Sequence, residues 1–426
     1  MAGYAHNPVS PARPAPAIPA RYLRPLITFA TAAALALAPN ACTRRIEIEP
    51  PPEGVPTVRV LLLRGRDRAE VRIPGPYRIV LRTDSDETEE LAAGDGLATT
   101  VVTYQRGDIS VSGVIARAPG IVEFIPQDVP FRLDGSSYRG SLLIAPGSDG
   151  LRAINLVDME GYLRGVVPGE MYTNWPEAAL QAQAVAARTY ALARMRARAD
   201  RDYDLVSTTA DQRYAGLDAE KGTTDAAVLA TAALALYHRG WPFAAYYHSC
   251  CGGHTADPLS ALGDPRSPIQ PVPCTYCEDS REFEWTQRIP RQETLAKLGV
   301  EGATGIQIAQ RSPDGRVTQV DVRRGDEPPV SMTGAAFRQR VGGMVVRSTL
   351  FRVRRDGDRY VFQGRGFGHG VGMCQWGARG MAEAGNDFRQ ILEAYYPGAE
   401  LRSAYELEDG GDHSPTNADP GETAGG

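Results

Sequence analysis

The feature that most constrains this chain is a stretch near residue 170 in which a mostly apolar run meets a turn signal and then an alanine-rich helix pattern. The run, residues 162–167, leads into Pro168-Gly169, and Glu170 follows directly. We expect a turn here, and turns held by a rigid scaffold commonly carry catalytic groups. Gln181 and Arg188 lie seven positions apart, which puts them on one face of the helix. A solvated glutamate and a solvated arginine would give the same pattern, so the residues alone leave both interpretations open.

The N-terminal part of the chain has the composition of an export signal. Residues 1–20 are rich in proline and alanine, and we expect them to be an unstructured leader. Residues 21–42 contain two arginines and then an apolar run over 26–38, which is too short to span a bilayer as a helix and suits a secretory signal. Cys42 could alternatively be a lipidated N-terminal residue. We therefore expect an exported protein, periplasmic or in the cell envelope, that meets a membrane only through its signal or a lipid anchor.

The rest of the chain divides by pattern into a linker, two folded regions and a tail. The linker, residues 43–56, contains three consecutive prolines. Residues 57–150 hold short apolar or alternating runs between turn signals, which is typical of a β-rich lobe. Residues 151–402 mix strand and helix patterns, and residues 403–426 have the composition of a disordered tail. The predicted fold class is α+β, with a β-rich lobe and a helix-containing lobe.

Four helices can be placed from periodicity and end signals. The first should start with Asn174 as its cap and run to about residue 199. The others are expected over residues 223–237, 333–341 and 378–396. The net charge of −5 gives no indication of nucleic-acid binding.

Cysteine spacing indicates a second kind of site. Of the six cysteines, four fall between positions 250 and 277, beside a histidine in a glycine-rich turn. This spacing suits tetrahedral zinc, with the preferred ligand set Cys250, His254, Cys274 and Cys277. Cys251 or His248 could replace one member, and in an exported protein the same cysteines could form disulfides. Such a zinc ion would be structural, because four protein ligands leave no open position.

A glycine-rich strip near the C-terminus is the other distinctive segment. Five glycines fall within residues 364–372, around His369, and Gln375 follows. Such density means that the backbone approaches another group closely or takes positive φ angles. The strip does not fit a dinucleotide-binding fingerprint, because no acidic residue follows at the required distance.

Taken together, these motifs resemble the SpoIID/LytB (stage II sporulation protein D) family. The family pattern V-x-x-E-M is present at residues 167–171, and A-Q-A-V-A-A-R-T-Y-A is present at 182–191. Its Q-x-Y-x-G turn corresponds to residues 212–216, and its G-x-G-H-G-V-G-M-S-Q-x-G-A signature to 366–378. The one departure in that signature is Cys374 in place of serine, which we expect to matter only if the hydroxyl bonds substrate. The resemblance spans roughly residues 57–402, so residues 151–402 are interpreted as a SpoIID-like catalytic region.

The resemblance implies an enzyme that acts on peptidoglycan glycan strands. The family includes lytic transglycosylases with a catalytic glutamate at this motif position, so Glu170 is implied as the general acid and base. One carboxylate suffices for this reaction, because the 6-hydroxyl of N-acetylmuramic acid attacks its own C1 and the nucleophile is internal to the sugar. Further motif positions are implied to line a glycan cleft and orient sugar or stabilise charge: Arg188, Gln212, Tyr214, His369 and Gln375.

A non-catalytic function is the alternative. Other family members are amidase enhancers or wall-binding modules, and Glu170 would then only bond a ligand or cap a helix. The partners implied by the resemblance are therefore peptidoglycan glycan strands and, in the alternative, a cell-wall amidase.

Overall fold

Alternating apolar side chains build the first folded part of the chain as two sheets. The computed structural model describes residues 54–82 and 88–405. In β2 (Arg68–Ile73) every second side chain is buried, which gives the strand one face in the core. The predicted leader, export signal and Cys42 lie outside the described residues, as do all but three residues each of the predicted linker and tail.

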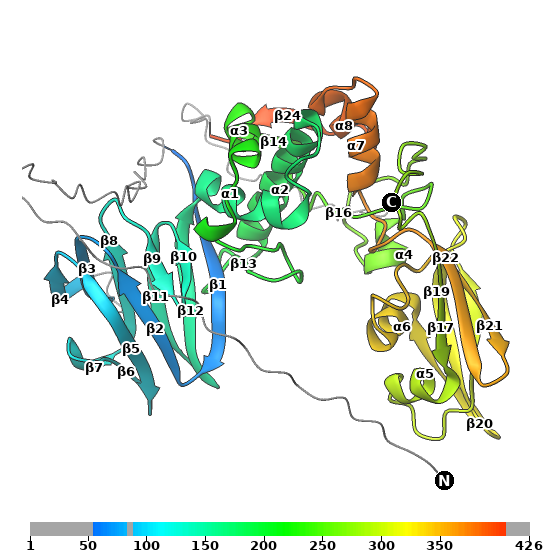
Figure 1. Cartoon of the computed structure of the whole chain (residues 1–426), viewed down its shortest axis with the longest axis horizontal. Helices are drawn as coiled ribbons and strands as arrows, with labels where there is room; N and C mark the ends of the chain where they lie inside the picture. Colours follow the sequence, from blue (N-terminus) through cyan, green and yellow to red (C-terminus); the bar gives the residue numbers. More distant parts are fainter. Residues whose placement is uncertain (1–53, 83–87, 406–426) are drawn as a thin grey trace, which may run out of the picture. The chain divides into compact units, whose positions relative to one another are not determined.

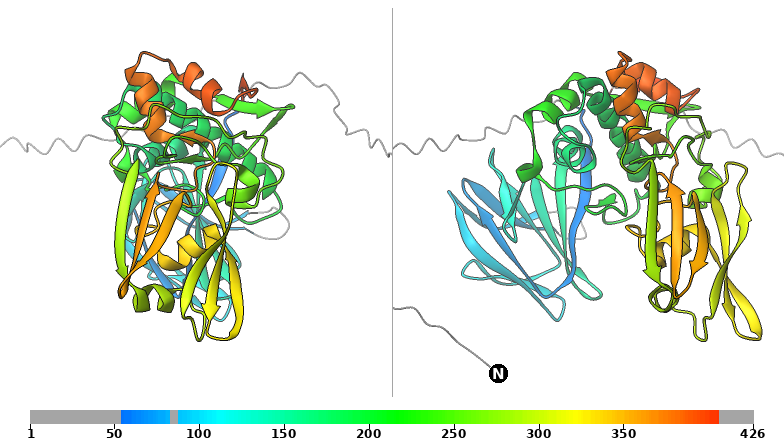
Figure 2. Two further views of the ribbon diagram at one scale, coloured as in Figure 1. Left: turned by 90° about the vertical axis from the view of Figure 1, so that its right-hand side faces the viewer. Right: turned by 45° about the vertical axis from the view of Figure 1, so that its right-hand side comes forward.

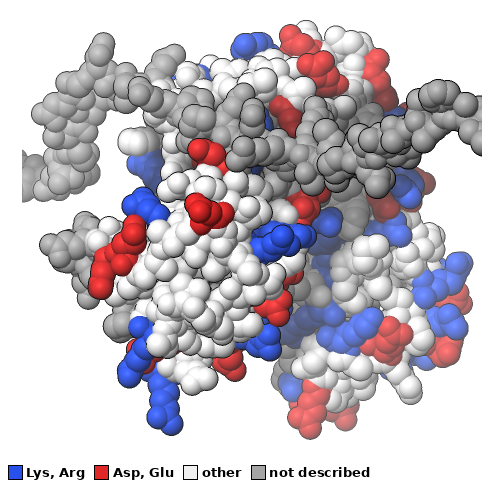
Figure 3. Space-filling view, turned by 60° about the vertical axis from the view of Figure 1, so that its left-hand side comes forward, with Lys and Arg blue, Asp and Glu red and all other residues white. Residues whose placement is uncertain are grey.

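The two sheets share one apolar core and form a β-sandwich (Figures 1 and 2). The larger described sheet has the order β13 (Leu205–Val206), β1 (Thr57–Arg66), β12 (Gly150–Asp158), β11 (Ser141–Gly147), β8 (Ile121–Pro126), β3 (Tyr77–Arg82), β4 (Thr88–Gly94). The other has the order β10 (Ser136–Tyr138), β9 (Phe131–Leu133), β2, β5 (Leu97–Gln105), β6 (Asp108–Val111), β7 (Ile115–Pro119). On the face drawn in Figure 3, acidic and basic side chains lie interspersed among uncharged ones.

Three helices follow the sandwich and carry the first motifs. They are α1 (Met159–Glu170), α2 (Glu177–Ala197) and α3 (Gly222–Ala230). The expectation that Asn174 caps α2 is wrong: the cap position is Pro176, and no side chain bonds the helix end there. The helix expected over 223–237 is also too long, because Ala233 takes a positive φ of 63° and the chain then enters β14 (Leu234–His238).

The last helices pack on α2. The predicted helix 378–396 is two helices, α7 (Gln375–Glu383) and α8 (Phe388–Tyr395), because Gly385 takes a φ of 91° and Asp387 caps a new helix start. Both share an apolar core with α2 (Figures 1 and 2). Nearby strands are β24 (Glu400–Ser403), which pairs with β14, and β15 (Trp241–Pro242).

A further αβ region lies between residues 284 and 365. Its strands are β17 (Glu284–Pro290), β22 (Arg359–Arg365) and β21 (Phe351–Asp356) in one sheet, and β18 (Gly305–Arg311), β19 (Val317–Arg324) and β20 (Glu327–Thr333) in another. Its helices are α5 (Arg291–Lys297) and α6 (Gly334–Val341), and the prediction of a helix over 333–341 is confirmed, with Thr333 as the cap. Helix and strand side chains share one core around Phe337. The predicted mixture of helices and strands is therefore present, with the strands divided among several sheets.

One short parallel pair brings two distant motifs together. β16 (Tyr247–His248) pairs with β23 (Met373–Cys374), so His248 lies opposite Cys374. Two further short helical segments are α4 (Pro258–Leu262) and the 3-10 helix η1 (Leu217–Ala219), which packs on α1 and β10. Within the described residues, no helix is both long and apolar enough to cross a membrane.

Candidate functional site

Glu170 is the last residue of helix α1, and the predicted turn at Pro168-Gly169 is therefore wrong. A neighbouring segment, residues 213–215, packs against this part of the helix. The amide of Ala215 donates to the carbonyl of Gly165 at 3.1 Å. A Cβ added at Gly169 would lie 2.7 Å from the carbonyl oxygen of Arg213, so glycine is needed for this close approach.

That close approach sets the environment of the Glu170 carboxylate. The backbone amide of Arg213 donates to Glu170 Oε1 at 2.7 Å. Burial raises the pKa of Glu170 above its ordinary value, and the hydrogen bond from Arg213 opposes the rise. A half-buried carboxyl with a raised pKa keeps a proton more readily near neutral pH, as a general acid must.

A cavity of about 720 Å³ brings Glu170 and His369 together. The two residues lie almost two hundred positions apart in the sequence, and His248 and Asp211 line the same cavity, whereas Gln212 does not. Further groups that line it were not predicted: Tyr190, Arg194, Asp211, Tyr246, Tyr247 and Arg338. The sequence signal that could have identified Tyr190 and Arg194 was their i,i+4 spacing, which places them on one face of α2.

Two neutral histidines stand side by side at the cavity, with ring centroids 5.6 Å apart. Burial lowers the pKa of His369 to about 4 and that of His248 well below its ordinary value. His369 Nδ1 accepts the amide proton of Val371 at 3.0 Å, and His248 Nδ1 lies 3.0 Å from the Val371 carbonyl. Both rings are thus fixed by the same backbone residue of the glycine-rich strip.

Asp211 is a second carboxylate in the cavity, but cations and donors occupy its oxygens. Arg198 donates to both oxygens, at 2.7 and 3.1 Å, and the hydroxyl of Tyr190 donates at 3.1 Å. Only 2% of the Asp211 side chain is exposed, and Arg194 lies 3.5 Å from it. Hydrogen bonds and ion pairs therefore occupy the oxygens of Asp211, whereas Glu170 accepts only the Arg213 amide and is the carboxyl of this lining suited to proton transfer.

Arg188 does not reach the cavity. Its side chain is fully buried and forms a bidentate ion pair with the Glu160 carboxylate, at 2.6 and 2.9 Å. A third donor bonds the carbonyl of Leu234 at 2.9 Å. The expectation that Arg188 lies in the cleft is corrected accordingly, because its guanidinium bonds Glu160 and backbone carbonyls in the protein interior and does not line the cavity.

Gln212 and Tyr214 are both buried, and neither lines the cavity. The amide of Gln212 donates to the hydroxyl of Tyr247 at 3.0 Å and accepts from the hydroxyl of Tyr162 at 3.0 Å. The hydroxyl of Tyr214 donates to the side chain of Asn155 at 2.8 Å. Both are therefore corrected from sugar contacts: Gln212 supports Tyr247, which lines the cavity, and Tyr214 packs in the core beside Tyr162 of α1.

Gln375 also supports rather than lines the cavity. Its side-chain nitrogen donates to the backbone carbonyl of Glu170 at 3.1 Å and to Gln183 at 3.2 Å. The residue after the glycine-rich strip is therefore bonded directly to the end of α1.

The cysteine site differs from the preferred ligand set. The Sγ atoms of Cys251, Cys274, Cys277 and Cys374 all lie within 4.8 Å of one another, and all four residues are buried. A cluster of this kind could hold a metal ion. Cys250 is not a member, and His254 instead has its Nδ1 2.8 Å from the carbonyl of Thr255. The alternative ligand set that included Cys251 agrees better with this cluster than the preferred set does. The sequence analysis did not include Cys374, because Cys374 reaches the other cysteines through the pairing of β16 with β23.

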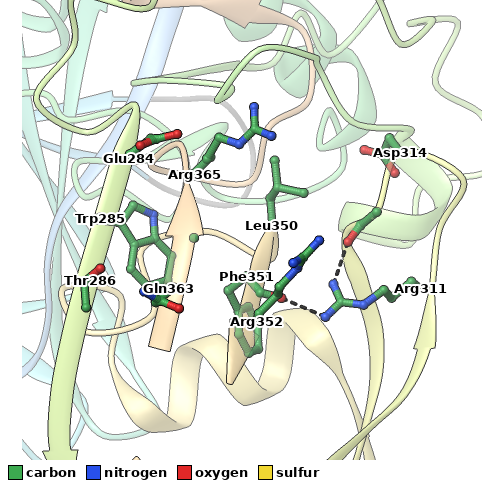
Figure 4. Close-up of a pocket in the computed structure, with 12 residues that line it drawn as sticks. Glu284, Trp285, Thr286, Arg311, Asp314, Leu350, Phe351, Arg352, Gln363 and Arg365 are labelled. Atoms are coloured by element: carbon green, nitrogen blue, oxygen red, sulfur yellow. Dashed lines mark hydrogen bonds between the residues drawn. The ribbon is translucent and has the colours of Figure 1, made fainter. Parts of the chain in front are cut away.

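A separate hollow of about 730 Å³ lies on the sheet of β17, β22 and β21. Figure 4 shows Arg311, Arg352 and Arg365 around it, with Trp285 along one wall. Two donors of Arg311 are used by the carbonyls of Gly315 and Phe351. This hollow contains none of the sequence-predicted site residues.

Fold and site together define a protein with a half-buried glutamate in a cavity that the glycine-rich strip also lines. Residues 147–238 match the family described as SpoIID, Stage II sporulation protein. Residues 278–372 match a domain of unknown function, DUF8618. Together with the relatives below, these matches confirm the resemblance, and the chain belongs to the SpoIID family.

Three relatives show how far the similarity extends. An uncharacterized protein of Brachyspira hyodysenteriae is 32% identical over 350 residues, which cover 81% of this chain and 92% of the relative. Stage II sporulation protein D of Bacillus amyloliquefaciens is 30% identical over 59% of this chain and 76% of its own length. The amidase enhancer of Bacillus subtilis is 27% identical over 57% of this chain, but the match covers only 40% of that protein.

Proposed function

We propose that this protein is a peptidoglycan lytic transglycosylase that cleaves the bond between N-acetylmuramic acid and N-acetylglucosamine. The observation that carries the proposal is Glu170, a carboxyl with a pKa raised by burial, in one cavity with the glycine-rich strip. A glycan strand is the substrate class that the family resemblance implies. Tyr190, Tyr246 and Tyr247 give the cavity aromatic and hydroxyl groups suited to sugar rings.

The reaction would need one proton carrier. Protonated Glu170 donates its proton to the glycosidic oxygen as the bond to C1 breaks, and the leaving sugar departs with a free 4-hydroxyl. The 6-hydroxyl oxygen of the same N-acetylmuramic acid then bonds to C1 and loses its proton to the Glu170 carboxylate. The products are a 1,6-anhydro end and a regenerated acid, and no water is consumed.

The hydrogen bonds of Asp211 support this route over hydrolysis by two carboxylates. Most glycoside hydrolases use a second carboxylate as base or nucleophile. Asp211 is the other acidic group in the cavity lining, and its oxygens accept hydrogen bonds from Arg198 and Tyr190. Positive charge from Arg194 and Arg338 would instead hold negatively charged groups of the strand.

The test is the mass of the product formed from purified glycan strands without stem peptides. Wild-type protein should release fragments with 1,6-anhydro ends, and Glu170→Gln should reduce the rate by about 10²–10⁴-fold. Asp211→Asn serves as a comparison, because it removes the other carboxylate of the cavity. Ordinary reducing ends from the wild type would show a hydrolase and would contradict the proposal.

A non-catalytic role beside a cell-wall amidase is the second candidate. The relative named amidase enhancer favours it, although the match covers less than half of that protein. Under this proposal the cavity binds glycan without cleaving it. Wild-type protein would then give no anhydro ends, but would increase the rate of a purified amidase on whole peptidoglycan, and Glu170→Gln would retain that effect.

Either function would place the protein outside the cytoplasm, in the periplasm or cell envelope where the polymer lies, as the export signal predicts. Neither function uses the four-cysteine cluster in a chemical step. We propose zinc as its ion, in a structural role, because four protein ligands fill a tetrahedral coordination sphere.

A further inference from the structure

We propose that Cys251, Cys274, Cys277 and Cys374 bind a single zinc ion, and that this ion holds the glycine-rich strip in place at the cavity. The four thiols come from three separate segments of the chain. Cys251 follows β16, Cys274 and Cys277 lie before β17, and Cys374 ends β23. The metal assignment stands on its own, whereas the consequence for the cavity rests on the function proposed above.

The first argument is the spacing of the sulfurs. Four sulfurs at about 2.3 Å from a tetrahedral zinc lie roughly 3.8 Å from one another. Here all four Sγ atoms are within 4.8 Å of one another, and those of Cys251 and Cys277 are 3.5 Å apart. Small movements would complete a tetrahedron, whereas a disulfide would require two sulfurs to approach to about 2.05 Å.

The second argument is the set of donors that surround the sulfurs. The Sγ of Cys374 accepts the backbone amides of Cys251 and Gly377, both at 3.3 Å. Cys274 Sγ lies 3.1 Å from the hydroxyl of Tyr395. Such outer contacts orient metal ligands and stabilise their charged form.

The third argument is charge and packing. A zinc ion with four thiolates carries a net negative charge, and buried Arg316 donates to the carbonyl of Cys251 at 2.9 Å. Arg316 also pairs with Asp314 at 3.0 Å, so this buried guanidinium joins the backbone of one ligand to a neighbouring carboxylate. A Cβ at Gly377 would come within 2.6 Å of Cys274 Sγ, so only glycine lets α7 begin this close to the cluster.

The ligand segments are also walls of the cavity. His248 pairs with Cys374 across β16 and β23, and the backbones of Cys250 and Phe367 bond each other at 2.7 and 3.1 Å. His248, Phe367 and His369 line the cavity, and Gln375 bonds the Glu170 carbonyl. An ion between these segments would fix the strip against the end of α1.

The experiment compares metal content in the full chain with two single substitutions. Wild type and Cys250→Ser, whose thiol is buried next to the site but is not a ligand, should each retain one zinc per chain. Cys374→Ser should lower zinc affinity by at least about 10–100-fold. Equal zinc loss in both variants would overturn the ligand set.

Two measurements on the wild type keep the test valid if Cys374→Ser does not fold. Metal-stripped protein given Co²⁺ should show the absorption of a tetrahedral cobalt thiolate. No such bands, or a mass lower by four hydrogens without reductant, which would show two disulfides, would overturn the metal assignment.

Glycan binding then tests the link to the cavity. In Glu170→Gln protein, zinc removal should weaken binding of a glycan strand by about tenfold, and zinc addition should restore it. Unchanged binding after zinc removal would overturn the link. Absence of glycan binding in zinc-loaded protein would instead overturn the proposed function, and the zinc content would show that the metal site is intact.

Discussion

The side chain of Gln375 donates a hydrogen bond to the backbone carbonyl of Glu170, at 3.1 Å, although the two residues are 205 positions apart. The same nitrogen also donates to Gln183 at 3.2 Å. Gln375 thus ties α2, the end of α1 and the segment after the glycine-rich strip to one point. Helix C-terminal carbonyls lack partners inside the helix, so this bond satisfies one of them and fixes the orientation of Glu170.

Gln375→Ala should therefore impair activity more than substrate binding. The loss leaves the Glu170 carbonyl and Gln183 without this donor, which should cost about 1–3 kcal/mol of unfolding free energy. We expect kcat for glycan cleavage to fall by about tenfold while KM changes little, since Gln375 does not line the cavity. Gln310→Ala, at an exposed position on β18, is the matched control and should change neither quantity. A rise in KM alone would show that Gln375 contacts the sugar.

Gly169→Ala tests the contact that shapes the Glu170 environment. The new methyl would meet the carbonyl oxygen of Arg213 at 2.7 Å, so the 211–216 segment must shift. We expect a loss of about 1–3 kcal/mol in unfolding free energy. A weakened Arg213 bond should also raise the pKa of Glu170 further, because that bond favours the charged form.

The measurement for Gly169→Ala is the pH dependence of glycan cleavage. A general acid is lost as pH rises through its pKa, so the alkaline limb of the profile should move to higher pH than in the wild type. Gly222→Ala, at a helical position with open space around it, is the control and should leave the limb in place. A shift toward lower pH would contradict the assigned role of the Arg213 amide.

Arg188→Met should destabilise the protein rather than change substrate recognition. It leaves Glu160 without its ion-pair partner in a largely buried position, with 15% of that side chain exposed. Removal of one partner of a buried pair typically costs about 3–5 kcal/mol, which urea denaturation would measure. Arg188→Lys should also be destabilised, because lysine cannot reproduce the two-pronged contact. Exposed Arg201→Met is the control, and a stable Arg188→Met with a raised KM would return Arg188 to the cleft.

The sequence predicted the motifs better than the contacts between them. Glu170 and His369 were identified from local patterns, and the structure brings both to one cavity. The local pattern of Asp211 gave no sign of its ion pair, because that role depends on Arg198 at the end of α2. Cys374 was interpreted as a substitute for serine. Its place in the cysteine cluster depends on the tertiary pairing of β16 with β23, which the local sequence does not reveal. Arg188 is the opposite case, because it occupies a prominent position in the motif but forms a buried ion pair with Glu160.

The two cavity histidines should make stability depend on pH below neutrality. Their pKa values are lowered in the folded state, to about 4 for His369, so the unfolded chain binds more protons between about pH 6.5 and 4. Unfolding free energy should therefore fall as pH falls through that window, by at most about 1.4 kcal/mol per pH unit for each histidine. Glu170, whose pKa is raised, acts in the opposite direction, so the comparison must be made between variants. His369→Gln should flatten the decline, relative to the wild type, when urea denaturation is measured from pH 7.5 to 4.5. An unchanged slope in His369→Gln would show that folding does not lower the pKa of His369, and would contradict the effect of burial assigned to this ring.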